Sequence, residues 1–132
     1  MLAALPLLAI AVVAYNILAL VLGIDLARPL FAVALPSGAA WSLSMGDLLI
    51  CLALVLLFFE VLKATRAAGA AVLDHAASMA VFVICLLEFL LVPGCGTSVF
   101  LIITLTAFID VIAGFSVGVA SARRDISVSD RL

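Results

Sequence analysis

Residues 46–65 read GDLLICLALVLLFFEVLKAT, and no charged residue lies between Asp47 near the start and Glu60 near the end. An α-helix rises about 1.5 Å per residue, so a run of this length covers the roughly 30 Å hydrocarbon core of a bilayer. The side chains inside the run are almost all apolar, which a lipid environment favours. This stretch therefore predicts a transmembrane helix.

Three further stretches of the chain share this apolar character. They are residues 2–22, 73–92 and 98–122. Of the 132 residues, 69% are hydrophobic and 11% are charged, against roughly half and about a quarter in a soluble domain. A soluble domain of this size could not hide so much apolar surface from water. We expect an all-α membrane protein, residues 1–132 forming one domain with four transmembrane helices in a bundle.

The predicted helices begin beside residues that can cap them. Ser44 and Asp47 have the spacing of a capping box for the second helix. Asp74 is a candidate cap for the third helix, and Thr97 or Ser98 for the fourth. Short oxygen-bearing side chains suit these places because they accept hydrogen bonds from the free N–H groups of the first turn.

The segment 24–45, between the first two helices, predicts a β-hairpin. Residues 30–35 and 39–45 are extended candidates on either side of Pro36-Ser37-Gly38. Proline suits the second position of a tight turn and glycine the fourth. An isolated two-stranded hairpin is marginally stable in water, so we expect it to be supported by lipid headgroups, another loop or another subunit. Trp41 suits the membrane interface.

The distribution of basic residues predicts the orientation, because short cytoplasmic loops are enriched in Lys and Arg. The segment between the first two helices holds only Arg28. The other five basic residues follow the second or the fourth helix, and they are Lys63, Arg66, Arg123, Arg124 and Arg131. The hairpin is therefore expected outside the cytoplasm, and both termini inside it.

Four segments carry a resemblance to a group of uncharacterised small four-helix inner-membrane proteins of proteobacteria. They are residues 36–41 (PSGAAW), 60–66 (EVLKATR), 73–75 (LDH) and 108–115 (FIDVIAGF). The resemblance extends over nearly the whole chain. It implies the bacterial inner membrane as the location, and it implies no activity.

Several classes of function find no support in the sequence. No basic run is long enough to follow a nucleic-acid backbone. No nucleophile–base pair, zinc-protease motif or phosphate-binding loop is present, so we expect no enzyme and no cofactor. His75 is the one histidine, at the start of the third helix, which leaves it solvated or in a capping role. Cys51 and Cys85 lie in apolar runs and are expected in the core, whereas Cys95 lies in a loop and is expected to be accessible.

Ionisable residues within a span are costly and are therefore candidates for function. Asp110 is the deepest, about 18 Å from either end of the fourth predicted span. Its depth predicts a protonated carboxyl that donates a hydrogen bond, and Lys63, about 13 Å nearer the cytoplasm by helical rise, is expected to be too far to pair with it. Glu60 precedes Lys63 by three residues, a spacing that predicts an interfacial ion pair.

Near the outer end of the predicted bundle, three polar residues from different helices are expected to form one polar layer. They are Asn16, Glu88 and Thr104.

Small residues line one side of the fourth predicted helix. Gly114 and Gly118 have the GxxxG spacing that allows two helices to approach closely. A helical wheel places Thr106, Ala107 and Asp110 on the same side, with the bulky residues opposite. The small side is expected to be packed, either within the bundle or between subunits.

Three functions remain open from the sequence. The first is a non-catalytic accessory or scaffold subunit of a membrane complex, or a homo-oligomer, with lipid and other membrane proteins as partners. The second is a small transporter or channel for protons, ions or a solute that uses Asp110. The third is a quinone- or haem-associated membrane anchor, although one histidine near the surface cannot supply two axial ligands.

Overall fold

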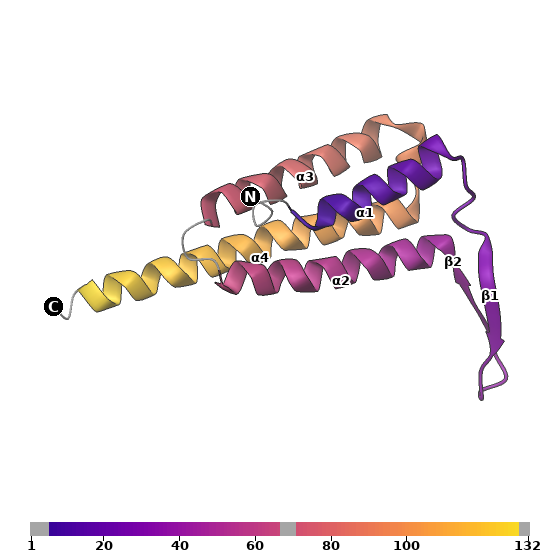
Figure 1. Cartoon of the computed structure of the whole chain (residues 1–132), viewed down its shortest axis with the longest axis horizontal. Coiled ribbons are helices and arrows are strands. Elements are labelled where there is room, and N and C mark those ends of the chain that lie inside the picture. Colours follow the sequence, from indigo (N-terminus) through magenta and orange to yellow (C-terminus); the bar gives the residue numbers. More distant parts are fainter. Residues whose placement is uncertain (1–5, 67–70, 130–132) are drawn as a thin grey trace.

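The structure is a computed structural model of the chain and describes residues 6–66 and 71–129. The elements in chain order are α1 (Leu8–Tyr15), the π-helix η2 (Asn16–Val21), β1 (Pro29–Ala34), β2 (Ala40–Ser44), α2 (Met45–Arg66), α3 (Ala71–Leu91), the 3₁₀ turn η3 (Pro93–Cys95) and α4 (Ser98–Ser129). Figure 1 shows the helices side by side, with α1 and α3 running toward the hairpin and α2 and α4 running away from it.

Three of the described helices are long and apolar enough to cross a membrane. They are Met45–Thr65, Val72–Leu91 and Ser98–Ala120, with mean hydropathies of 2.4, 1.8 and 2.2. The expectation of a helical membrane protein is confirmed at this level. The predicted second and third spans, 46–65 and 73–92, agree with the observed helices within two residues at each end.

The N-terminal helix is shorter in the described residues than the predicted span 2–22. Its apolar stretch runs from Leu8 to Val21, and residues 2–5 lie outside the described residues. The helix widens from α to π geometry at Asn16. It ends at Gly23, which has a φ of +62° that glycine adopts without steric cost.

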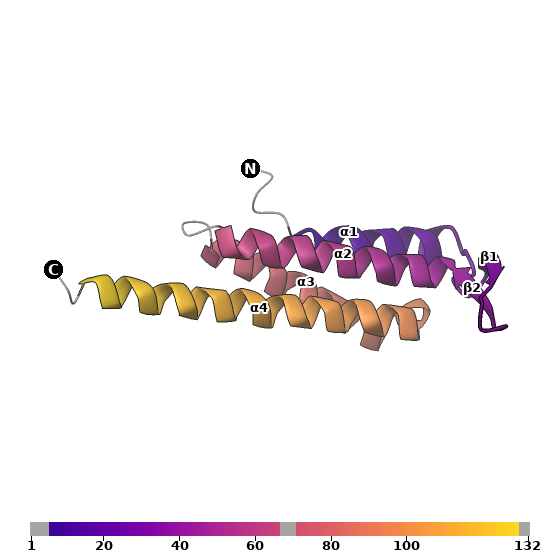
Figure 2. The same cartoon turned by 90° about the horizontal axis from the view of Figure 1, so that it is seen from below.

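Helix α4 is 32 residues long and continues past the predicted end at residue 122. Figures 1 and 2 both show its C-terminal part extending beyond the other helices, at the end opposite the hairpin. Along the bundle, α4 packs most extensively against α3 and α2. Thr106, Ala107 and Asp110 are buried at these contacts, and the bulky residues predicted on the other side are exposed. They are Leu105, Phe108, Ile112, Phe115 and Val119.

Two of the predicted caps are confirmed. The Ser44 backbone N–H donates to Asp47 Oδ2 at 2.8 Å, and the Asp47 N–H donates to Ser44 Oγ at 3.1 Å, which completes the capping box of α2. Thr97 Oγ1 accepts a hydrogen bond from the Phe100 N–H at the start of α4. The prediction that Asp74 caps the third helix is wrong, because α3 begins at Ala71 and Asp74 lies inside its first turn.

The predicted hairpin is confirmed as an antiparallel pair of strands. Its turn is closed by a hydrogen bond from the Gly38 N–H to the Leu35 carbonyl at 2.9 Å, with Pro36 in the second position of the turn. Gly38 has a φ of +83°, which a residue with a Cβ rarely adopts. The register pairs Val33 with Trp41, and it is interrupted by a bulge between Pro29 and Phe31.

The core lies between the four helices toward the hairpin end. Its largest buried side chains include Tyr15 and Phe100, whose ring centroids are 4.7 Å apart. Cys85 is buried, as expected. The expectations for the other two cysteines are wrong: Cys51 is exposed on the surface of α2, and Cys95 is 0% exposed because η3 folds it into the core.

Candidate functional site

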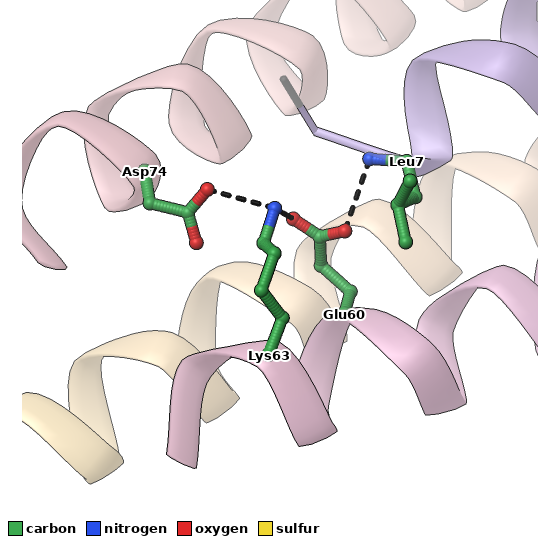
Figure 3. A network of polar contacts seen from close by, with 4 residues as sticks. All are labelled: Leu7, Glu60, Lys63 and Asp74. Atoms are coloured by element: carbon green, nitrogen blue, oxygen red, sulfur yellow. Dashed lines mark hydrogen bonds and ion pairs between the residues drawn. The ribbon is translucent and has the colours of Figure 1, made fainter. Parts of the chain in front are cut away.

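Glu60, Lys63 and Asp74 form a network of ion pairs that joins α2 to α3. The Lys63 Nζ atom lies 2.6 Å from Glu60 Oε1 and 2.8 Å from Asp74 Oδ1. Figure 3 shows the ammonium group between the two carboxylates. The structure thus contains the pair between Glu60 and Lys63 that the sequence spacing indicated, and it adds a second carboxylate from the next helix.

The second oxygen of Glu60 holds the start of α1. Glu60 Oε2 accepts a hydrogen bond from the Leu7 N–H at 3.0 Å, and α1 has no side-chain cap of its own. A carboxylate suits this place because the first N–H groups of a helix have no intrahelical partner and carry partial positive charge. Both carboxylate oxygens are therefore bonded, although Glu60 is only 2% exposed.

Asp110 lies beside this network and is 5% exposed. Its carboxyl group shares a hydrogen bond with the buried side chain of Ser78 on α3, and it interacts electrostatically with Glu60, Asp74 and Lys63. The electrostatic interaction with Lys63 crosses from α4 to α2, where the sequence places the two residues about 13 Å apart by helical rise.

His75 lies in the same region, because it directly follows Asp74 in α3. Its Nδ1 atom is 3.2 Å from where a Cβ on Gly114 would be, and its ring centroid lies 6.2 Å from that of Phe115. Nδ1 is buried and has no hydrogen-bond partner among the described residues. The half-buried His75 therefore packs against α4, a contact that the sequence does not predict.

The two glycines of the GxxxG pair lie in different surroundings. A Cβ on Gly114 would press against His75, so this position permits the close contact between α3 and α4. At Gly118, by contrast, no atom of the described residues lies within 4 Å of that position. Within the described part of one chain, the contact at this glycine pair is therefore made at Gly114.

A second polar cluster lies at the hairpin end. Asn16 Nδ2 donates to Glu88 Oε1 at 2.9 Å, which links η2 to α3. Cys95 Sγ lies 3.8 Å from Asn16 Oδ1 as a weak donor. Thr104, the third expected member of this layer, donates instead to the Phe100 carbonyl of its own helix at 2.9 Å. The structure therefore brings Asn16 and Glu88 together and leaves Thr104 out of the pair.

Tyr15 is the residue that the sequence reasoning missed. Its hydroxyl lies 2.9 Å from the Gly94 carbonyl oxygen and 2.7 Å from Thr97 Oγ1. These contacts tie α1 to the turn between α3 and α4. A single tyrosine in an apolar helix could have indicated such a role, since a buried hydroxyl needs a partner.

Within residues 6–66 and 71–129, no group of three or more His, Cys, Asp or Glu side chains is arranged to hold a metal ion. A pocket of about 480 Å³ lies at the base of the hairpin, away from the ion pairs, and Tyr15, Asp25, Ser44 and Thr97 are among its lining residues. The ion pairs of Glu60, Lys63 and Asp74 join α2 to α3, and the bond from Leu7 to Glu60 also attaches the start of α1.

Comparisons with known proteins add no assignment. The chain matches no protein-family profile, no curated protein and no solved structure.

Proposed function

We propose that this chain is a non-catalytic inner-membrane protein that acts as an accessory or scaffold subunit, or as a homo-oligomer. The observation that supports the proposal most directly is how little of the three long spans is buried within one chain. Only 22%, 17% and 39% of their most apolar windows are buried. The remaining surface is available to lipid and to other membrane proteins.

The polar residues within the spans support the same proposal. Lys63 bonds to both Glu60 and Asp74. Asp110 bonds to Ser78, and Asn16 bonds to Glu88. Each of these contacts links different helices or, for Glu60 with Lys63, adjacent turns of one helix. Such bonds hold a bundle in one arrangement and leave its outer surface apolar for association.

The oligomeric state tests this proposal. The full chain would be extracted from its native membrane in a mild detergent and weighed by native mass spectrometry. We expect an assembly larger than one chain, containing either several copies or a second protein. A single chain of 13.7 kDa, also seen after crosslinking in the intact membrane, would contradict the proposal.

A second function, movement of protons or cations across the membrane, is favoured by one observation. Three carboxyl groups, from Glu60, Asp74 and Asp110, share the surroundings of a single ammonium group, Lys63. If all four were ionised, the cluster would carry excess negative charge in a poorly solvated region, which a proton or a cation would relieve.

The variants Asp110→Asn and Asp110→Leu distinguish the two functions. If Asp110 is structural, asparagine keeps the hydrogen bond to Ser78 and is tolerated, whereas leucine removes it and lowers thermal stability. The unsatisfied partner would cost about 1–3 kcal/mol. If Asp110 carries protons or cations, Asp110→Asn folds and assembles normally but abolishes a pH-dependent or cation-dependent flux in liposomes.

A further inference from the structure

The hairpin has two unlike faces. Val33 pairs with Trp41 and Phe31 with Leu43, and residues directly opposite in an antiparallel pair point to the same side. The rings of Phe31 and Trp41 are in edge-to-face contact, 5.8 Å apart, which places both pairs on one side. We call these four residues the apolar hairpin face. The other side holds the pairs Ala32 with Ser42 and Ala34 with Ala40, all of them small.

The bulky side chains on this face are uncovered in the isolated chain. Phe31 is 49% exposed, Val33 47% and Trp41 45%. No residue from 29 to 46 is charged. A water-exposed hairpin normally carries polar or charged residues on at least one side and at its edges. The composition of this segment therefore indicates surroundings less polar than water.

The root of the hairpin is fixed at the end of a candidate span. β2 ends at Ser44 and α2 begins at Met45 with no linker between them, and Met45 is also the first residue of the span. The capping box holds this junction, together with a hydrogen bond from the Gly46 N–H to the Leu26 carbonyl at 2.8 Å. The hairpin therefore starts at the level where α2 enters the membrane.

The direction of the hairpin keeps it at that level. Figure 1 shows the strands running across the long axis of the helices and projecting sideways beyond the bundle, and in the view of Figure 2, turned by 90°, they are foreshortened at the end of the bundle. With α2 upright in a bilayer, such a hairpin lies along the membrane surface, above lipid that the helices do not cover. A hairpin directed along the helix axis would instead have carried Trp41 away into water.

We propose that the apolar hairpin face rests on the lipid beside the bundle, at the level of the headgroups, and acts as an interfacial anchor for α2. Tryptophan and phenylalanine rings favour this zone. The outer edges of the two strands have backbone groups without strand partners, and these need hydrogen bonds that headgroups and water supply but hydrocarbon does not. The hairpin therefore lies at the interface and does not enter the hydrocarbon core.

Trp41 is the one tryptophan in the chain, so its fluorescence reports on this face without labelling. The full chain would be reconstituted in vesicles of phosphatidylethanolamine and phosphatidylglycerol, with brominated lipids as quenchers from the membrane side. Lipids brominated near the headgroup end of the acyl chain should remove more of the emission than lipids brominated near its methyl end. Acrylamide on both sides of the vesicle should quench less than it quenches free tryptophan.

A matched variant tests which face meets the lipid. In Trp41→Phe with Ser42→Trp, the probe moves to the opposite side of the hairpin, and acrylamide should then quench it more and brominated lipid less. Val33→Glu should weaken the quenching of Trp41 by brominated lipid, whereas Ala32→Glu, on the small side, should leave it unchanged. Far-ultraviolet circular dichroism confirms that each variant keeps its helices.

Two results would overturn the proposal. Emission of Trp41 that acrylamide quenches fully and brominated lipid does not would place the face in water. Shielding of Trp41 from both quenchers would mean that protein covers the face, either a second copy of the chain or another subunit.

Discussion

The ammonium group of Lys63 on α2 lies 2.8 Å from the carboxylate of Asp74 on α3. This contact joins two helices that are consecutive in the chain. Because Lys63 also binds Glu60 at 2.6 Å, and Glu60 in turn accepts the Leu7 N–H, a single side chain stabilises the arrangement of α1, α2 and α3.

Lys63→Met should destabilise the bundle, because it leaves two buried carboxylates without their cation. Breaking a fully buried pair costs about 3–5 kcal/mol, and we expect roughly 1–3 kcal/mol here because the Lys63 side chain is 21% exposed and partly screened by solvent. Thermal unfolding in detergent measures the effect. Arg28→Met, which removes a cation from an exposed loop, is the control and should leave the thermal unfolding midpoint unchanged. Equal unfolding midpoints for Lys63→Met and the parent chain would contradict the stabilising role of Lys63.

The hydroxyl of Tyr15 should contribute to stability independently of its ring. Tyr15→Phe keeps the packing against Phe100 but removes the contacts with Gly94 and Thr97. We expect a loss of about 0.5–1.5 kcal/mol, because the Gly94 carbonyl loses a donor and the Thr97 hydroxyl loses a partner, and both residues are exposed to solvent. Ser116→Ala is the matched control, since that exposed hydroxyl bonds only within its own helix. A loss in Tyr15→Phe no larger than in Ser116→Ala would refute the role of the hydroxyl.

The sequence was sufficient to predict the long helices and the hairpin turn, because both follow from local rules. Twenty apolar residues span a bilayer, and Pro36 with Gly38 fits one kind of turn. The spacing of Glu60 and Lys63 predicted their pair for the same reason. Ser44 and Asp47 likewise act within one turn, so their capping box was visible in the sequence.

The contacts between helices could not be predicted in this way. Asp74 met the requirements of a cap, yet it lies opposite Lys63 on another helix and forms an ion pair with it. Cys95 lies in a short turn that would normally be exposed, but η3 folds it inward. The position of Asp110 along its own helix does not reveal that Ser78 on α3 lies beside it. Each of these features depends on how segments distant in the chain pack together, which periodicity does not specify.

Cys95 should resist alkylation in the folded protein. Its side chain is buried, and burial raises the pKa of the Cys95 thiol, as does the nearby Glu88 carboxylate. A raised pKa means less of the reactive thiolate at neutral pH, so labelling should become faster only at a more alkaline pH than for an exposed cysteine. N-ethylmaleimide should therefore label Cys95 slowly in the folded protein and quickly after unfolding in sodium dodecyl sulfate, and mass spectrometry of peptides identifies the site. Equal rates for Cys95 in the folded and the unfolded chain at neutral pH would contradict the buried turn.

The orientation can be tested with new cysteines at the two ends of the bundle. Ser37 is exposed in the turn between β1 and β2, and Arg123 is exposed on the C-terminal part of α4. Figure 1 shows this part of α4 at the end opposite the hairpin. The basic residues at the end of α2 and near the end of α4 indicate that the Arg123 end is cytoplasmic. A membrane-impermeant maleimide added to cells with a permeabilised outer membrane should therefore label Ser37→Cys, and it should label Arg123→Cys only after the inner membrane is disrupted. The parent chain is the control, because Cys85 and Cys95 are buried and Cys51 lies on the lipid-facing surface of a span, so little label is expected before disruption. Labelling of Arg123→Cys in intact cells, with Ser37→Cys protected, would reverse the orientation and place the hairpin in the cytoplasm.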